Sequence, residues 1–501
     1  MRFALRPLIP AVALLALPAF ALHAAATNAA TKAGTSAATS RDSRLAGAYT
    51  FERGGWTYVH LQGSPYDIGY QHGYLLGARI ADNLRVYQVE TLHDTHRDWA
   101  FYRAASKKML WPHIPTEYRQ ELEGIADGAR AQGIHVDVWD IVALNAMQEL
   151  PGYYVPWLDA QQHKTVPAGA HPASHCSAFI ATGQWTKDGK ITMAHNNWTT
   201  YAEGERWTMI FDIKPTHGYR IIQDGEPGVI VSDDDFGINS AGIMSTETTI
   251  SDFKGWNPNG IPEFVRARMA LQYGGTIDQY VALMEKGNNG GYANDWLIGD
   301  RKTGEIAYLE LGLKYTHLWR KTDGFFVSSN FARDPDVLRY ETPGFNYNNL
   351  SLGSNARRVR WHELMAEYKG KIDVHLAEQF MGDDYDTWTH KESPDQRTLC
   401  GHVEFSTVAL SKDWGAYYPA GAVQGKVTDS DLAAHMELIA RAGHPDGENF
   451  HVKPFLAAHP QYSWMKPILG NMIAGPWTEF AAGETASAPV ADTGATVAAA
   501  R

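Results

Sequence analysis

Cys176 is the residue whose position in this sequence best suits covalent chemistry. It directly follows a polar segment rich in Pro, Gly and Ala, DAQQHKTVPAGAHPASH (residues 159–175), and it opens a strand-like stretch over 176–182. A segment of this composition has no apolar face to bury, so we expect an exposed, protease-sensitive linker. A cut before Cys176 would leave the thiol and a free α-amino group on one residue. The amine, with a pKa of about 8, can serve as the base that activates the thiol.

The Cys176 thiol can also make this cut itself. We expect it to attack the carbonyl of His175 and to form a thioester, from which water releases the upstream segment. Mature Cys176 would then attack the acyl carbonyl of a substrate and transfer the acyl group to water. This is the chemistry of an N-terminal nucleophile that matures by autoproteolysis.

A second strand is expected to return to Cys176 and to bring polar residues with it. The sequence KDGK at 187–190 predicts a hairpin turn, and the strand after it ends in His195, Asn197, Trp198 and Thr199. His195 is a candidate for orienting the amine or the substrate. The alternative is a hydrogen-bonded or solvent-facing strand histidine with no role in the site.

Acyl transfer also needs hydrogen-bond donors already in place for the oxyanion that forms. Thr248 and Thr249 end another predicted strand and are candidates for one such donor. The amide of Asn294 is a second candidate, and an Asn that caps a strand end is its alternative.

Six short blocks, in the same order, resemble the phospholipase B-like proteins and the wider autoproteolytic acyltransferase family that includes isopenicillin N acyltransferase. They are GSPYDIGYQHG (63–73), HCSA (175–178), AHNNW (194–198), GINSAG with ETTI (237–250), NDWLIGD (294–300) and SNARR (354–358). The resemblance covers about residues 57–410, most of the expected fold. One block alone is a weak signal, and six in order are a specific one.

The resemblance implies an α+β fold, the four-layer αββα sandwich of the N-terminal-nucleophile hydrolases. It implies that Asn294 supplies an oxyanion amide and that Arg357 is the arginine of the site, whose charge would favour the thiolate. Arg358 and Arg360 follow, so an arginine row on a solvated helix is the alternative. In the acyltransferases the strand after the nucleophile ends in Asn-Trp-Asp. Thr199 stands here at the Asp position, which leaves the carboxylate partner of the amine unassigned.

The coarse pattern of the chain agrees with two sheets covered by helices. Helical patterns cover most of 66–150, then 261–286 and 357–381, and strand patterns cover 176–250 and 294–330. Two packed sheets with helices on their outer faces would bury these patterns. Gly69, Gly73 and Gly77 recur every four residues, which predicts close backbone packing along one helix face.

The ends of the chain are expected to lie outside the fold. Arg2 and Arg6, an apolar stretch over 8–22 and an Ala-Ala-Ala cleavage site predict a signal peptide, and therefore a periplasmic or secreted protein. The expected parts are the signal peptide (1–26), a disordered linker (27–46), an N-terminal helical chain (47–158), the exposed linker (159–175), the catalytic chain (176–480) and a disordered tail (481–501).

Composition excludes several classes of function. The chain has 501 residues and a net charge of −12, so binding to nucleic acid or to anionic lipid is disfavoured. No stretch after the signal predicts a transmembrane segment, and no serine elbow, zincin, P-loop or Rossmann motif is present. The sequence therefore implies no cofactor and no metal. The run at 233–235, three Asp residues, could bind a metal, but a solvated acidic turn is the expectation.

Three alternatives remain open at this point. The scissile bond is an amide, as in most relatives of this fold, or a lipid ester, as the phospholipase B-like resemblance implies. The expected partners are a small acyl-amide or lipid substrate and the cleaved N-terminal chain. A different class is a secreted ligand-binding protein held by a Cys176–Cys400 disulfide. The third is a scaffold that cleaves itself and turns over no substrate.

Overall fold

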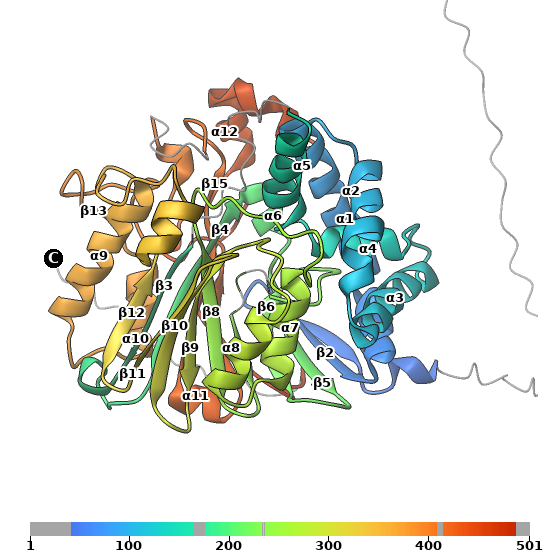
Figure 1. The fold of residues 1–501 in the computed structure, drawn as a ribbon, viewed down its shortest axis with the longest axis horizontal. Coiled ribbons are helices and arrows are strands. Elements are labelled where there is room, and N and C mark those ends of the chain that lie inside the picture. Colours follow the sequence, from blue (N-terminus) through green and yellow to red (C-terminus); the bar gives the residue numbers. More distant parts are fainter. Residues whose placement is uncertain (1–41, 164–175, 233, 235, 408–413, 487–501) are drawn as a thin grey trace, which may run out of the picture. The chain divides into compact units, whose positions relative to one another are not determined.

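Two large β-sheets lie face to face at the centre of the fold in this computed structural model (Figure 1). The structure describes residues 42–163, 176–232, 234, 236–407 and 414–486. In the nine-stranded sheet the order is β1 (Tyr49–Arg53), β2 (Trp56–Gly63), β5 (Met209–Pro215), β6 (Ile221–Gly225), β7 (Gly237–Asn239), β8 (Ile243–Thr249), β9 (Asn294–Asp300), β10 (Glu305–Leu311) and β11 (Thr316–Lys321). Neighbouring strands are antiparallel except for β2 and β5, which are parallel.

The six-stranded sheet contains the strand that follows Cys176. Its order is β12 (Gly324–Ser328), β3 (Ser177–Thr182), β4 (Thr192–Thr200), β15 (Ala420–Asp429), β16 (Glu437–Ala442) and β17 (Thr478–Ala481). All its pairs are antiparallel. A separate two-stranded ribbon joins β13 (Tyr385–Asp386) and β14 (Lys391–Glu392).

Helices cover the outer face of each sheet. The nine-stranded sheet is covered by α1 (Pro65–Thr95), α3 (Thr116–Ala131), α4 (Val138–Asn145), α7 (Glu263–Tyr273) and α8 (Ile277–Glu285), and the six-stranded sheet by α9 (Gly353–Glu367) and α10 (Val374–Met381). The remaining helices are α2 (Trp99–Ala105), α5 (Val155–Gln161), α6 (Tyr201–Gly204), α11 (Ser430–Ala434) and α12 (Val452–Ala458).

Strand alternation builds three stacked cores from these elements. On β3, Ala178 and Ile180 pack between the sheets, whereas Phe179 and Ala181 pack against the helices α9 and α10. Successive side chains of a strand point to opposite faces, so a strand buried on both faces reads as a continuous apolar run. The predicted four-layer αββα sandwich is confirmed.

The glycines of α1 allow a close crossing with α3. A Cβ at Gly73 would lie 1.9 Å from the carbonyl oxygen of Ile125, and one at Gly69 would lie equally close to the carbonyl oxygen of Glu121. At Gly77 the nearest atom is 3.2 Å away and belongs to the side chain of Ile134, which can move. The predicted packing role therefore holds most strongly for the first two positions.

Gly73→Ala is expected to lower the free energy of unfolding by about 2 kcal/mol, because the added methyl group meets rigid backbone and must separate the helices. Gly77→Ala is the matched control and should change stability much less. Denaturant unfolding of the two variants checks this. Equal effects at both positions would contradict the packing argument.

The boundaries of the parts differ from the expected ones. Ser43–Leu45 form a 3-10 turn inside the expected disordered linker, and β17 ends at Ala481, inside the expected tail. The exposed linker was expected to begin at Asp159, but α5 runs to Gln161 and Asp159 is buried against Arg97 at 2.6 Å. The predicted signal peptide (1–26), residues 164–175 and residues 487–501 lie outside the described residues. Within the described ranges, no helix has both the length and the apolarity to cross a membrane.

Candidate active site

Cys176 lies at the head of β3 on the face between the two sheets. The register pairs Ser177 with Asn196 and Ala178 with His195, so Asn197 is the residue of β4 that faces Cys176 one step further on. The thiol is buried, and its Sγ lies 4.0 Å from Oδ1 of Asn197. The hairpin therefore brings Asn197 beside Cys176, as expected.

Arg357 reaches the same place from α9 and is 1% exposed. Its Nη1 donates a hydrogen bond to the carbonyl oxygen of Cys176 and another, of 3.0 Å, to Oγ of Ser177. Its guanidinium lies 4.5 Å from the centre of the Trp198 ring. Burial lowers the pKa of Arg357 to about 9, against an opposing influence from Cys176. The alternative of a solvated arginine is wrong for this position.

Asn330, which the sequence did not predict as a site residue, joins this arginine to the nine-stranded sheet. Its Oδ1 accepts a hydrogen bond of 3.1 Å from Arg357, and its Nδ2 donates one of 2.9 Å to the carbonyl of Thr249. Asn330 adopts a left-handed conformation (φ 67°), which Asn tolerates better than most residues. The signal available in the sequence is the polar Ser-Ser-Asn run that ends an apolar strand.

Thr248 lies between the sheets. It exchanges a hydrogen bond with Ser328, which stands opposite Ala178 in the register of β12 and β3. Ala178 is two residues after Cys176, and both face the space between the sheets, so Thr248 lies near the Cys176 end of β3. The Thr248 hydroxyl already has a hydrogen-bond partner in Ser328.

Asn294 is the first residue of β9 and stands opposite Thr249. It is buried, and within the described part of the chain neither atom of its side-chain amide has a hydrogen-bond partner. Alternation puts Asn294 on the helix-facing side of β9 with Trp296, while Cys176 faces the space between the sheets. Asn294 pairs with Thr249, and the carbonyl of Thr249 accepts a hydrogen bond from Asn330, which in turn accepts one from Arg357 beside Cys176. These contacts connect Asn294 to Cys176 around the strand ends. An unpartnered buried amide is costly and calls for an explanation such as a ligand.

His195 lies on the same face of β4 as Asn197, but its neighbours are acidic and basic side chains. Its Nδ1 is 2.7 Å from Oδ2 of Asp234, and Lys426 stands opposite it on β15. Lys426 Nζ contacts Asp234 and lies 2.7 Å from Asp224. Burial lowers the pKa of His195, although Asp234 opposes this effect. The structure therefore gives His195 a place in a buried charge cluster between the sheets.

Asp234 corrects a second expectation. The acidic run was expected to be a solvated turn, but Asp234 is fully buried. It is held by Lys426, His195 and a hydrogen bond of 2.9 Å from Ser232. A lysine of a distant strand provides the compensating charge, and no local pattern in the sequence announces it. Residues 233 and 235 lie outside the described part.

Two carboxyl groups, which the sequence did not predict as part of the site, lie beside the end of β4 at Thr199. The Thr199 hydroxyl donates a hydrogen bond to Glu203 of α6, and Thr200 donates one of 2.8 Å to Glu90 of α1. Burial raises the pKa of both glutamates, and the neighbouring Glu203 raises that of Glu90 further. The position where the acyltransferases carry Asp thus has a carboxyl group within reach through Thr199.

The two cysteines are free thiols, and both are buried. Cys176 faces the space between the sheets. Cys400 precedes Gly401, which packs against the ring of Trp198 on the opposite face of β4. The six-stranded sheet therefore lies between the two cysteines, and the Cys176–Cys400 disulfide is not formed.

Comparisons with known proteins add an independent finding. A family model for phospholipase B matches residues 79–309, a range that includes Cys176 and Asn294 but not Arg357. An uncharacterized protein of Archaeoglobus fulgidus is 27% identical over 49% of this chain and 41% of its own length. Phospholipase B of Crotalus adamanteus is 25% identical over 54% and 52%. Phospholipase B-like 1 of Homo sapiens is 30% identical over 46% and 43%.

The chain thus spans about half the length of these curated relatives. Among solved structures, a variant of conjugated bile acid hydrolase from Clostridium perfringens is similar with a TM-score of 0.32 and 11% identity, over 53% of this chain and 89% of that one. The family match confirms the resemblance to phospholipase B, and its range includes four of the six sequence blocks; the blocks at 63–73 and 354–358 lie outside it.

Proposed function

We propose that this chain is a member of the phospholipase B family, whose model matches residues 79–309, and that it is an exported, autoproteolytic hydrolase of acyl bonds with Cys176 as its nucleophile. The observation that carries the proposal is the position of Cys176. It opens a central strand immediately after residues 164–175, with Arg357 bonded to its carbonyl and Asn197 beside its thiol. A disulfide cysteine needs none of these features.

Maturation is a transfer of the upstream acyl group from nitrogen to sulfur. The thiol loses its proton and attacks the carbonyl carbon of His175, the peptide C–N bond breaks, and the new amine takes a proton. Water then hydrolyses the thioester and leaves a carboxylate on His175. Arg357 contributes by fixing the peptide unit of Cys176, so that the attacking sulfur keeps its direction.

Turnover repeats this chemistry on a substrate. The free amine of Cys176 takes the thiol proton and later gives it to the leaving group, and water then releases the acyl group as a carboxylic acid. We infer that the unpartnered amide of Asn294 donates to the oxyanion, since a preorganised donor is most valuable where water is excluded. Glu203, which accepts a hydrogen bond from Thr199, is a carboxyl group close to this end of β4 and is suited to hold the amine.

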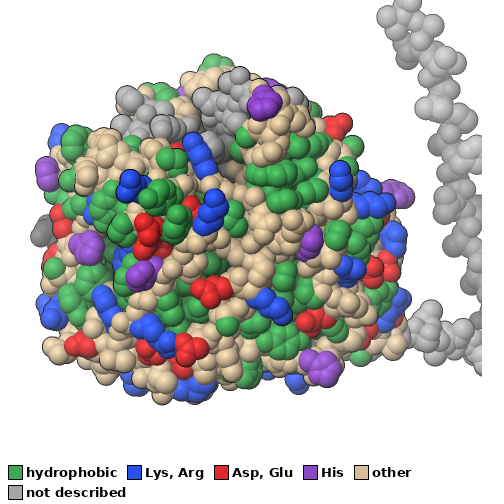
Figure 2. All heavy atoms as spheres, viewed as in Figure 1, with side chains coloured by type: hydrophobic (Ala, Val, Ile, Leu, Met, Phe, Trp, Pro, Cys, Tyr) green, Lys and Arg blue, Asp and Glu red, His purple; other side chains and the backbone are tan. Residues whose placement is uncertain are grey.

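An apolar pocket supports a substrate with an apolar acyl group. Its volume is about 360 Å³, and Tyr153, Trp157, Phe253 and Trp256 contribute to its lining. Tyr153 hydrogen-bonds the backbone of Ala293, the residue before Asn294. On the face drawn in Figure 2, hydrophobic side chains gather over α5, which forms one wall of this pocket.

The scissile bond is tested with two substrates that share one fatty acyl group, an N-acyl amide and a phospholipid. We expect wild-type protein to release the fatty acid from at least one of them, and the preferred substrate then identifies the bond. The names of the relatives favour the ester, and the thiol–amine pair suits the amide. Cys176→Ala is the control. Equal release by wild type and Cys176→Ala from both substrates would overturn the proposed activity.

A further inference from the structure

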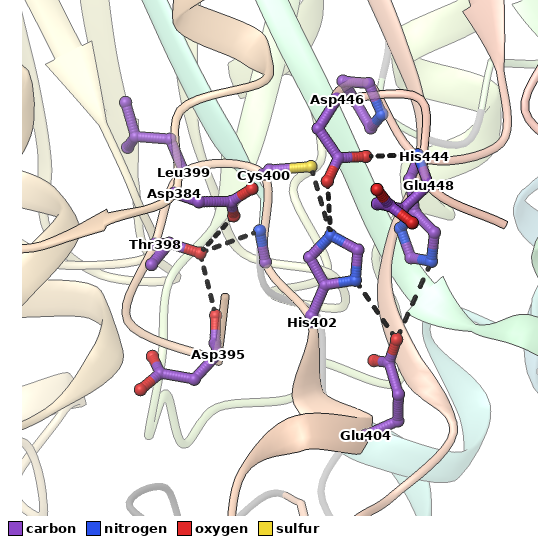
Figure 3. Close-up of polar contacts among 12 residues, drawn as sticks. Asp384, Asp395, Thr398, Leu399, Cys400, His402, Glu404, His444, Asp446 and Glu448 are labelled. Atoms are coloured by element: carbon purple, nitrogen blue, oxygen red, sulfur yellow. Dashed lines mark hydrogen bonds and ion pairs between the residues drawn. The ribbon is translucent and has the colours of Figure 1, made fainter. Parts of the chain in front are cut away.

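We propose that Cys400, His402, His444 and Asp446 form a structural zinc site on the side of Trp198 that faces away from Cys176. Figure 3 shows the sulfur of Cys400 and the carboxylate of Asp446 directed at the same nitrogen of His402. Cys400, His402 and His444 are each at most 1% exposed. One thiol, two imidazoles and a carboxylate are a ligand set that zinc binds readily.

The distances suit a tetrahedral ion. Zinc bonds of ordinary length place neighbouring ligand atoms roughly 3.3–3.8 Å apart. Cys400 Sγ lies 3.7 Å from Nε2 of His402, within this range. That nitrogen lies 3.1 Å from Oδ2 of Asp446, slightly below it, so this pair would have to open by a few tenths of an ångström around an ion. A nitrogen of His444 lies within 4.8 Å of the Cys400 and His402 ligand atoms, so a small shift of its ring completes the set. Asp384, which also lies near Cys400 and Asp446, is the alternative fourth ligand.

The surroundings of His402 are those of a metal-bound histidine. Its Nδ1 lies 3.1 Å from Oε1 of Glu404, and Glu404 accepts a hydrogen bond from the hydroxyl of Tyr201. Histidines that bind zinc through one nitrogen usually give the other N–H to a carboxylate, which fixes the ring and its tautomer. Here this second partner is present, and it is itself held in place.

His444 provides an independent observation. The ring is buried, and within the described part of the chain its nitrogens make no hydrogen bond of normal geometry to a side chain; the backbone of Ala422 contacts the ring closely. The ring packs against that of His402 with 4.1 Å between centres, and the nearest acidic oxygen, on Glu404, is 3.9 Å from Nε2. A buried imidazole that lacks a side-chain partner for one of its nitrogens is unfavourable, and a metal bond to that nitrogen would satisfy it.

The location gives the ion a consequence for the active site. Gly401 lies between two of the ligands, and a Cβ there would come within 1.8 Å of the Trp198 ring. The same Trp198 ring also stacks against the guanidinium of Arg357. A metal at this site would tie residues 400–402 to residues 444–446 and hold Trp198 and Arg357 in position.

The test is metal content, measured on the full chain in a Cys176→Ala background so that the nucleophile cannot hold the ion. After incubation with zinc and dialysis, the parent should retain about one zinc per chain by elemental analysis. Adding Cys400→Ser and His444→Ala together should reduce this at least tenfold, whereas adding His435→Ala, a change at an exposed histidine outside the cluster, should not. Removing zinc with a chelator should lower the thermal midpoint, and zinc, but not magnesium, should restore it.

Two outcomes would overturn the proposal. One is a parent that retains less than a tenth of an equivalent and melts at the same temperature with and without zinc. The other is equal retention by the parent and the double variant. If the double variant does not fold, cobalt replaces zinc in the parent and in the Cys400→Ser variant. A thiolate-to-cobalt absorption band is expected only with Cys400, and a band of equal strength in both proteins would contradict the site.

Discussion

Cys176→Ala is expected to remain a single chain and to lose acyl hydrolysis, while wild-type protein is isolated as two chains cut before residue 176. The reason is that one sulfur atom serves as nucleophile in both reactions, so no remaining group can form the thioester. Arg357 is expected to stay in place around the alanine, because it bonds to the backbone of residue 176 and to the side chain of Asn330. Intact mass and a denaturing gel measure the first effect, and fatty acid release measures the second.

The matched control is Cys400→Ala, which removes the other buried thiol and keeps the nucleophile. We expect it still to be cut before Cys176, although more slowly than wild type, because loss of the proposed zinc ligand loosens Trp198 and Arg357 but leaves the attacking sulfur in place. Cleavage of Cys176→Ala at the same bond would refute the mechanism, because the cut would then need another protease. A wild-type chain that stays whole with two reactive thiols would refute autoproteolysis as well.

Asn294→Leu is expected to reduce kcat by about 100- to 1,000-fold, the usual effect of removing one oxyanion donor. Because the Asn294 amide has no partner within the described part of the chain, the same change should leave stability unchanged or raise it. A variant that is more stable and much less active would show that the Asn294 amide serves catalysis and not the stability of the fold. Steady-state kinetics and thermal unfolding on the same preparations test the two halves of this prediction.

Asn239→Leu is the control for that experiment. Its amide donates to the carbonyls of Leu271 and Gly274 and accepts from the backbone of Ala241 and Ile243. Four satisfied hydrogen bonds are lost there, so Asn239→Leu should be clearly destabilised. If Asn294→Leu loses stability to the same extent and keeps its kcat, Asn294 has no role in stabilising the oxyanion.

The layers of the fold could be predicted because they depend on local patterns. Strands such as β3 read as continuous apolar runs, the helices have their own periodicity, and the αββα order followed from the family resemblance. The Gly69 and Gly73 spacing likewise predicted a close helix crossing, since it needs only one helix face. Element ends were less predictable. The helix α5 continues to Gln161, and its residue Asp159 pairs with Arg97 of a segment about sixty positions earlier, a contact that the local sequence does not indicate.

Site residues could be predicted where the sequence immediately around a single residue is distinctive. Cys176 stands out by the linker before it, and Arg357 by the block that surrounds it. Asn330 and Glu203 were missed because their significance lies in partners brought together only by folding. Asp234 was assigned to solvent for the same reason, since Lys426 follows it by 192 positions.

The cluster around Cys400 illustrates the same limit in another form. Its ligands occur as two short pairs, Cys-x-His at 400–402 and His-x-Asp at 444–446, about forty residues apart. Neither pair resembles a known zinc motif on its own. The antiparallel bridge between His402 and Gly421, together with the pairing of β15 and β16, brings the two pairs together. Reading both pairs jointly would have been the one available signal.

The parallel pairing of β2 with β5 has a consequence for how the mature protein survives stress. After the proposed cut, β1, β2 and α1 to α5 belong to one polypeptide and β5 belongs to the other, so a single sheet is shared by two molecules without a covalent link. After unfolding, the two polypeptides would separate. Reassembly would then depend on their concentration, because β2 and β5 would have to pair between two molecules. The mature enzyme would therefore persist by the slowness of its unfolding, not by its capacity to refold.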